Sequence, residues 1–138
     1  MQKKIVARIT RHPVDADRMA CLKAVFGDDV RVVTEDIRYG EDPVGAVKAL
    51  IEHLQADGDR VVAVEATAPF PVLSRLVNAQ RELGVALIRA QFARDEGGRA
   101  IVAGKDEGGR DILAFSHYEE IEKIELLTRR LGPPPEEK

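Results

Sequence analysis

The sequence predicts an α/β fold in which a parallel sheet is covered by helices and extended by an antiparallel β-meander. Two observations lead to this expectation. Short runs rich in β-branched residues alternate with segments of helical periodicity, and this alternation ends at two nearly identical Gly-Gly turns. Strand–helix–strand units of this kind form parallel sheets through right-handed crossovers.

The first predicted strand, Ile5–Ile9, runs directly into Thr10, Arg11 and His12 before Pro13 ends it. If this strand lies near the centre of a parallel sheet, Arg11 and His12 emerge at its carboxyl end. Open α/β sheets bind their ligands there, where the strand order reverses. The opening of the chain therefore predicts the place of a binding site.

Three amphipathic segments predict helices over residues 14–26, 43–56 and about 69–83. Each has apolar residues three or four positions apart, as expected for one buried helix face. In the second segment these residues are Val47, Leu50, Ile51 and Leu54. Glycines follow the first and third segments, at Gly27 and Gly84, where helices commonly end.

Three further strands are expected at residues 30–34, 61–64 and 85–92. The run at 61–64 is continuously apolar, which is typical of a strand covered on both faces. The run at 85–92 alternates more clearly, which favours a position nearer the sheet edge. The simplest order across the sheet is second, first, third and fourth strand.

The segment from Arg94 to Ala103 is nearly repeated from Lys105 to Ala114, and both copies contain Asp-Glu-Gly-Gly. An acidic Gly-Gly turn between short β-runs predicts a hairpin, because glycine readily adopts positive φ. We therefore expect the strand at 85–92 to continue into a meander with two shorter strands. Metal binding by the acidic residues is the less favoured alternative, since side chains at hairpin tips are rarely held still.

The last segment predicts a helix from Ser116 to about Leu131, with Ser116 and Glu119 as a capping box. Its apolar residues are Ile121, Ile124, Leu127 and Leu131. Residues 1–132 would then form a single three-layer, Rossmann-like α/β domain, and residues 133–138 a flexible tail of proline, glutamate and lysine.

Composition excludes several classes of protein. The chain has 138 residues, which suits one domain, and its single cysteine, Cys21, rules out a disulfide framework or a cysteine-rich zinc site. One cysteine suits a cytoplasmic location. No apolar run approaches the roughly 20 residues of a membrane helix. The net charge of −3, with both signs interspersed, argues against duplex nucleic acid or a membrane as partner.

Familiar catalytic motifs are absent. The sequence has no Gly-x-x-x-x-Gly-Lys-Ser/Thr loop, no Gly-x-Gly-x-x-Gly after its first strand, and no Gly-x-Ser-x-Gly elbow. These absences argue against a P-loop enzyme, an ordinary dinucleotide enzyme and an α/β-hydrolase.

Polar residues at the strand exits are the candidate site. Arginine presents a fixed fork for phosphate and histidine titrates near neutrality, so we assign candidate catalytic roles to Arg11 and His12. The candidate ligand-binding residues are Thr10, Glu35, Glu65, Thr67, Gln91 and Arg94. Together they predict a site for a nucleotide or phosphate ester, with no cofactor or metal.

Other interpretations of these residues stay open. Arg11 and His12 can instead form salt bridges to Glu35 or Glu65 and cap the strand ends. A metal-dependent nuclease using Glu35, Asp36 and Glu65 ranks last, because no lysine stands at the usual spacing. Tyr39, in the loop after the second strand, is a candidate for stacking on a base.

The stretch Ile9-Thr10-Arg11-His12-Pro13, followed by a short helix and a second strand, resembles small Rossmann-like CRISPR-associated proteins. Several such families are cyclic-oligoadenylate ring nucleases related to CARF sensor domains. The resemblance implies a homodimer that holds a cyclic RNA messenger between facing strand ends. It also implies metal-free cleavage by the ribose 2′-hydroxyl, with Arg11 stabilising phosphate charge and His12 orienting or protonating.

The leading hypothesis is therefore a dimeric domain that binds a nucleotide or phosphate ester, and cleavage of a cyclic oligoadenylate is the activity that the resemblance would add. The alternative is a non-catalytic, homo-oligomeric interaction module, built through the meander or through the apolar side of the last helix.

Overall fold

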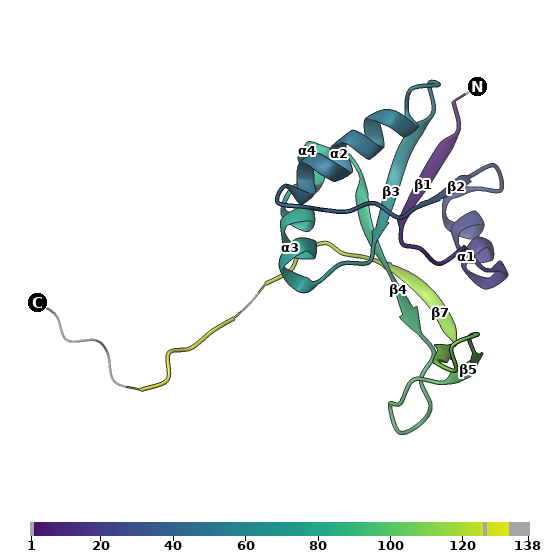
Figure 1. The fold of residues 1–138 in the computed structure, drawn as a ribbon, viewed down its shortest axis with the longest axis vertical. Helices are drawn as coiled ribbons and strands as arrows, with labels where there is room; N and C mark the ends of the chain where they lie inside the picture. Colours follow the sequence, from purple (N-terminus) through teal and green to yellow (C-terminus); the bar gives the residue numbers. More distant parts are fainter. Residues whose placement is uncertain (1, 126, 133–138) are drawn as a thin grey trace, which may run out of the picture.

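The computed structural model describes residues 2–125 and 127–132, so the tail expected at 133–138 lies outside the described residues. Within these residues helices and strands follow one another in the order shown in Figure 1. They are β1 (Lys4–Ile9), α1 (Ala16–Phe26), β2 (Arg31–Glu35), α2 (Pro43–Leu54), β3 (Arg60–Ala66), α3 (Phe70–Asn78), α4 (Gln80–Leu83), β4 (Ala86–Phe92), β5 (Val102–Lys105), β6 (Asp111–Leu113) and β7 (Phe115–Glu120).

The main sheet has five strands in the order β2-β1-β3-β4-β7. The first four of these are parallel to one another, and β7 pairs with β4 in the antiparallel direction. Strands β5 and β6 form a separate two-stranded antiparallel sheet. The prediction of a mixed α/β fold with a mostly parallel sheet is confirmed.

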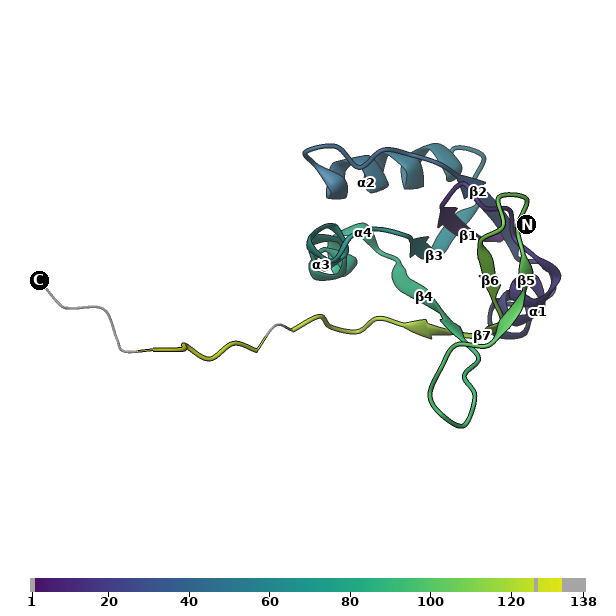
Figure 2. The same cartoon turned by 60° about the horizontal axis from the view of Figure 1, so that its bottom comes forward.

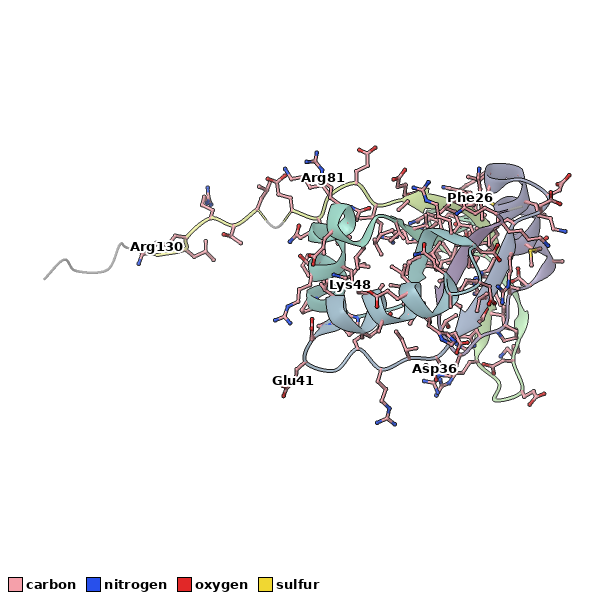
Figure 3. All side chains as sticks on the ribbon, turned by 90° about the horizontal axis from the view of Figure 1, so that it is seen from above. Phe26, Asp36, Glu41, Lys48, Arg81 and Arg130 are labelled. Carbon is pink, nitrogen blue, oxygen red and sulfur yellow. The ribbon has the colours of Figure 1, made fainter. Side chains whose placement is uncertain are left out.

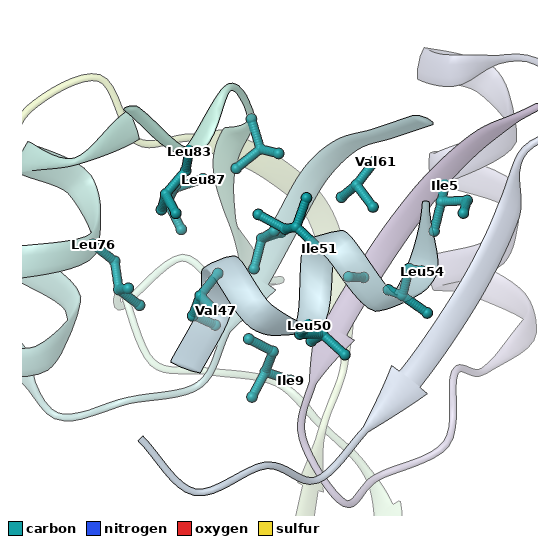
Figure 4. Packing of buried hydrophobic residues seen from close by; sticks show 14 of the residues in the cluster. Ile5, Ile9, Val47, Leu50, Ile51, Leu54, Val61, Leu76, Leu83 and Leu87 are labelled. Atoms are coloured by element: carbon teal, nitrogen blue, oxygen red, sulfur yellow. The ribbon is translucent and has the colours of Figure 1, made fainter. Parts of the chain in front are cut away.

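Alternation along β1 sends its side chains to two different apolar clusters. Ile5, Ala7 and Ile9 belong to the cluster that α2, α3 and α4 cover, and Figure 4 shows α2 packed on it. Val6 points to the other face, where Leu22 of α1 is fully buried. The sheet thus has helices on both faces, which leaves the carboxyl ends of its strands free for other contacts.

The expected meander is wrong in its pairing, although both Gly-Gly turns form. Asp95 and Asp106 each accept two backbone hydrogen bonds within their turn, and Gly98 and Gly109 both have a φ of +80°. However, β4 pairs with β7 and not with β5 (Figure 2). The Ala93 amide donates to the Ala114 carbonyl at 2.8 Å, so residues 93–114 form an excursion between two paired strands.

This pairing has a physical reason. Phe115 and Tyr118 of β7 pack near α1, with ring centroids 5.1 Å apart, whereas Ile101, Val102 and Ile112 of the excursion stay exposed. The strand whose aromatic residues become half-buried against α1 takes the place beside β4. Turn chemistry specifies the hairpins but does not specify which strand joins the main sheet.

The expected helix from Ser116 to Leu131 is also wrong. Residues 115–120 form β7, and the described residues after it contain neither helix nor strand. A β-bulge at Ser116, between the pairs Phe92–Phe115 and Gln91–His117, turns Phe115 and Tyr118 to the same face. The apolar residues that suggested a helix face share no buried face in the structure, since Ile121 is buried whereas Leu127 and Leu131 are exposed. Ser116 Oγ lies 2.8 Å from His117 Nδ1 and caps no helix.

None of the described helices combines the length and apolar character needed to cross a membrane.

Burial in the structure predicts opposite effects for two leucines. Leu76 of α3 is fully buried in the core, whereas Leu127 is 83% exposed. Leu76→Ala should lower the free energy of unfolding by about 2–5 kcal/mol, because it leaves a cavity. Leu127→Ala should change it by less than about 0.5 kcal/mol. Urea unfolding followed by circular dichroism measures both, and equal losses would contradict the extended path after β7.

Candidate functional site

A cavity of about 210 Å³ lies at the carboxyl ends of β1, β2 and β3. It is formed by the residues that follow these strands, where the polypeptide leaves the sheet. Its lining consists of Ile9, Thr10, Arg11, His12, Asp36, Ile37, Tyr39 and Thr67. The position agrees with the rule that open α/β sheets bind ligands beyond their strand ends.

Hydrogen bonds beyond the strands hold the three exits in register. The Thr10 amide donates to the Glu35 carbonyl at 3.2 Å, and the Thr67 amide donates to the Ile9 carbonyl at 3.3 Å. The parallel ladders thus continue one residue past β1 and β3. Polar side chains from separate parts of the chain are therefore brought to one edge of the sheet.

The exit of β1 presents two side chains that have no partner among the described residues. Arg11 and His12 are exposed, and their side chains make no hydrogen bond or salt bridge to any residue that the structure describes. The His12 amide donates to Thr10 Oγ1 at 3.2 Å, which shapes the turn. Within the described residues, neither Arg11 nor His12 forms the alternative salt bridge to Glu35 or Glu65. Both side chains remain free to contact an anion.

A buried polar network, unexpected from the sequence, lies beneath this exit. Arg8 is only 3% exposed, and its Nε donates to Glu65 Oε1 at 2.9 Å. One terminal nitrogen of Arg8 donates to the His12 carbonyl at 3.0 Å and lies 3.2 Å from Thr34 Oγ1. Tyr118 Oη donates to the same Glu65 oxygen at 2.6 Å. In the sequence, the one sign of this network is Arg8, a charged residue inside the otherwise apolar run of the first strand.

Four of the residues predicted for the site lie in the cavity lining: Thr10, Arg11, His12 and Thr67. The other four lie elsewhere. Glu65 points to the α1 face of the sheet and binds Arg8, and Glu35 is exposed at the end of β2. Gln91 lies in β4 opposite His117, and Arg94 donates to the Gly98 carbonyl at 2.9 Å in a hairpin turn.

Asp36, Ile37 and Tyr39 complete the lining from the loop after β2. From the sequence, Asp36 was a polar residue at a strand exit and a candidate metal ligand, and Tyr39 was a candidate stacking residue. The Tyr39 ring packs against the core, its hydroxyl is buried without a hydrogen-bond partner among the described residues, and burial raises its pKa to about 12. Burial and the hydrogen bond to Glu65 also raise the pKa of Tyr118.

The described residues do not bring together three or more His, Cys, Asp or Glu side chains that could hold a metal ion. Glu65 faces α1, whereas Asp36 lies in the cavity beyond β2 (Figure 3 labels Asp36). The carboxylate set of the metal-dependent alternative is therefore not assembled on one side of the sheet.

Comparisons with models of known protein families, with curated proteins and with solved structures found no match to this chain.

The two tyrosines of the chain provide a matched test of the buried network. Tyr118→Phe removes a hydrogen bond to an ionised carboxylate and should cost about 1.5–3 kcal/mol of unfolding free energy. Tyr39→Phe removes a hydroxyl that has no partner among the described residues, so stability should be unchanged or slightly higher. Chemical denaturation of both variants measures the difference, and an equal loss would argue against the network.

Proposed function

We propose that this chain binds a nucleotide or another phosphate ester at the carboxyl ends of β1, β2 and β3. The observation that carries the proposal is the cavity in which the unpaired side chains of Arg11 and His12 stand beside threonine hydroxyls. Arginine offers a planar fork of donors that matches phosphate, and hydroxyls of Thr10 and Thr67 can add neutral donors. The helices on both faces of the sheet support a Rossmann-like interpretation of the domain.

The other half of the lining suits a nucleoside. In dinucleotide-binding α/β domains, an acidic residue after the second strand accepts a hydrogen bond from ribose, and Asp36 stands at that position here. Tyr39, three residues further along, contributes an aromatic surface to the same cavity. The proposal therefore places phosphate near Arg11 and His12 and the sugar and base toward Asp36 and Tyr39.

The size of the cavity restricts what one chain can hold. Its volume of about 210 Å³ is below the roughly 300–1,000 Å³ of typical ligand pockets. One phosphodiester unit with part of a nucleoside suits this space better than a whole cyclic oligonucleotide. A larger ring would extend over the mouth of the cavity toward a second copy, as the resemblance to ring nucleases implies.

The reaction proposed from that resemblance is an internal transesterification of a 3′–5′-linked cyclic oligoadenylate. The ribose 2′-oxygen attacks the adjacent phosphorus, a new P–O2′ bond forms, and the P–O5′ bond breaks. The 2′-hydroxyl proton leaves to solvent, and the 5′-oxygen takes a proton from His12. The products are a 2′,3′-cyclic phosphate and a 5′-hydroxyl. Arg11 stabilises the charge that develops on the phosphate oxygens.

Thermal unfolding with cyclic tetra-adenylate, AMP and inorganic phosphate tests the binding proposal. A probe at 100 times its Kd should add about 2.7 kcal/mol, which raises the Tm by several degrees, with or without EDTA. Arg11→Ala should abolish the shift. Arg110→Ala, which removes an exposed arginine far along the chain, is the matched control and should retain it. An undiminished shift with Arg11→Ala would refute the assignment.

Chromatography of the products separates binding from cleavage. If His12 donates the proton, His12→Ala should slow formation of the 2′,3′-cyclic phosphate by about 10²–10⁴-fold while the thermal shift remains. A ligand that binds but is never cleaved would restrict the function to ligand sensing.

A second candidate function, a homo-oligomeric interaction module, is favoured by exposed apolar residues. Ile101, Val102 and Ile112 of the excursion are 42–47% exposed. After β7, Leu127 and Leu131 are 83% and 86% exposed. Figures 1 and 2 place the β5–β6 hairpin and the segment after β7 at opposite ends of the molecule, so neither covers the other within one chain.

On this second proposal, a second copy covers the β5–β6 hairpin, since two-stranded sheets are marginally stable alone. Sedimentation velocity should then detect a dimer that dissociates when Val102 and Ile112 are both replaced by serine. The dimer should persist in the Arg11→Ala, His12→Ala double variant. A wild-type protein that stays monomeric across the concentration range would contradict this function.

A further inference from the structure

We infer that Arg8 is a positioning residue of the proposed site, which fixes the main chain that carries Arg11 and His12. The effect of Arg8 on ligand affinity rests on the proposed function. Its effect on the order of the loop is independent of the proposed function. Arg8 itself lies outside the cavity lining, on the opposite face of β1 from Ile9.

The guanidinium of Arg8 joins the exits of three parallel strands. Its Nε donates to Glu65 of β3 at 2.9 Å. One terminal nitrogen reaches Thr34 Oγ1 of β2 at 3.2 Å and the His12 carbonyl beyond β1 at 3.0 Å. Because the guanidinium is planar and rigid, these contacts place the His12 carbonyl relative to both neighbouring strands.

The loop has few other restraints. Among the described residues, the main chain of residues 11–13 makes one further hydrogen bond, from the His12 amide to Thr10 Oγ1 at 3.2 Å. That bond lies within the loop and does not tie it to the sheet. Among the described residues, the contact from Arg8 is therefore the one hydrogen bond that joins the main chain of residues 11–13 to a side chain of the sheet, and Arg8 is in turn bonded to β2 and β3.

Arg8 is in turn held in place by groups from other strands. Glu65 compensates its charge and shares one oxygen with the hydroxyl of Tyr118, at 2.6 Å. Arg8 and Glu65 are both buried, so removing either charge alone would leave the other without a compensating charge. The carboxylate thus orients the guanidinium, and the guanidinium orients the loop. Preorganisation of this kind improves affinity, since less order is lost on binding.

Arg8→Lys provides the test, because it keeps the positive charge beside Glu65 and removes the fork that reaches His12. Order parameters from ¹⁵N relaxation for residues 11 and 12 should fall from about 0.85 toward 0.6 or lower. Affinity for cyclic tetra-adenylate, measured by calorimetry, should fall about tenfold or more, while core amides in α2 stay rigid. Thr34→Val keeps the His12 contact and should leave both quantities near wild-type values.

A second variant guards against misfolding of Arg8→Lys. The triple change Arg8→Met, Glu65→Leu, Tyr118→Phe replaces the buried polar network by apolar side chains, which protein cores commonly tolerate. It should fold and show the same mobile loop. A rigid loop in either variant would overturn the inference, as would a mobile loop with unchanged affinity.

Failure of the inference is distinguishable from failure of the proposed function. If the wild-type protein binds none of the probes, the proposed function fails, and the order parameters alone decide whether Arg8 fixes the loop. If Arg8→Lys binds cyclic tetra-adenylate as the wild type does and keeps a rigid loop, the inference fails and the proposed function stands.

Discussion

The buried pair of Arg8 and Glu65 is the interaction on which the rest of the site depends. Two opposite charges are removed from water inside a small sheet, a cost that is recovered only when geometry and further hydrogen bonds are favourable. Here Thr34, the His12 carbonyl and Tyr118 supply those bonds. The pair connects β1 with β3, while its additional partners draw in β2, the β1 exit and β7. One polar network thus links β1, β2 and β3, whose ends form the cavity, and connects them to β7.

Because side chains alternate along β1, the residue that supports the site and the residue that lines the cavity lie on opposite faces of the sheet. Along β1, Arg8 points toward α1 and into the polar network, whereas Ile9 points to the opposite face and lines the cavity. Arg11 and His12 then leave the sheet as exposed groups without partners among the described residues. The buried pair of charges therefore lies on one face of the sheet, and the exposed side chains of Arg11 and His12 lie at the strand end.

Local sequence patterns predicted the structure correctly where that structure depends on residues close together in the chain. The four residues predicted to form the buried face of α2, Val47, Leu50, Ile51 and Leu54, are all buried. The two Gly-Gly turns form because glycine accepts the positive φ required there. Patterns failed after β4, because the spacing of Ile121, Ile124, Leu127 and Leu131 predicted a helix in a segment that begins as a strand paired with β4. Turn chemistry also carries no information about which strand pairs with β4.

The sequence by itself determined the α/β class, the turns and the place where Thr10, Arg11 and His12 leave the first strand. Tertiary structure alone decided that Ile37 and Tyr39 line the same cavity and that Glu65 faces the other side of the sheet. The physical reason is that periodicity records which face of an element is buried. It does not record the register and pairing that bring distant residues such as Arg8, Glu65 and Tyr118 within hydrogen-bond distance.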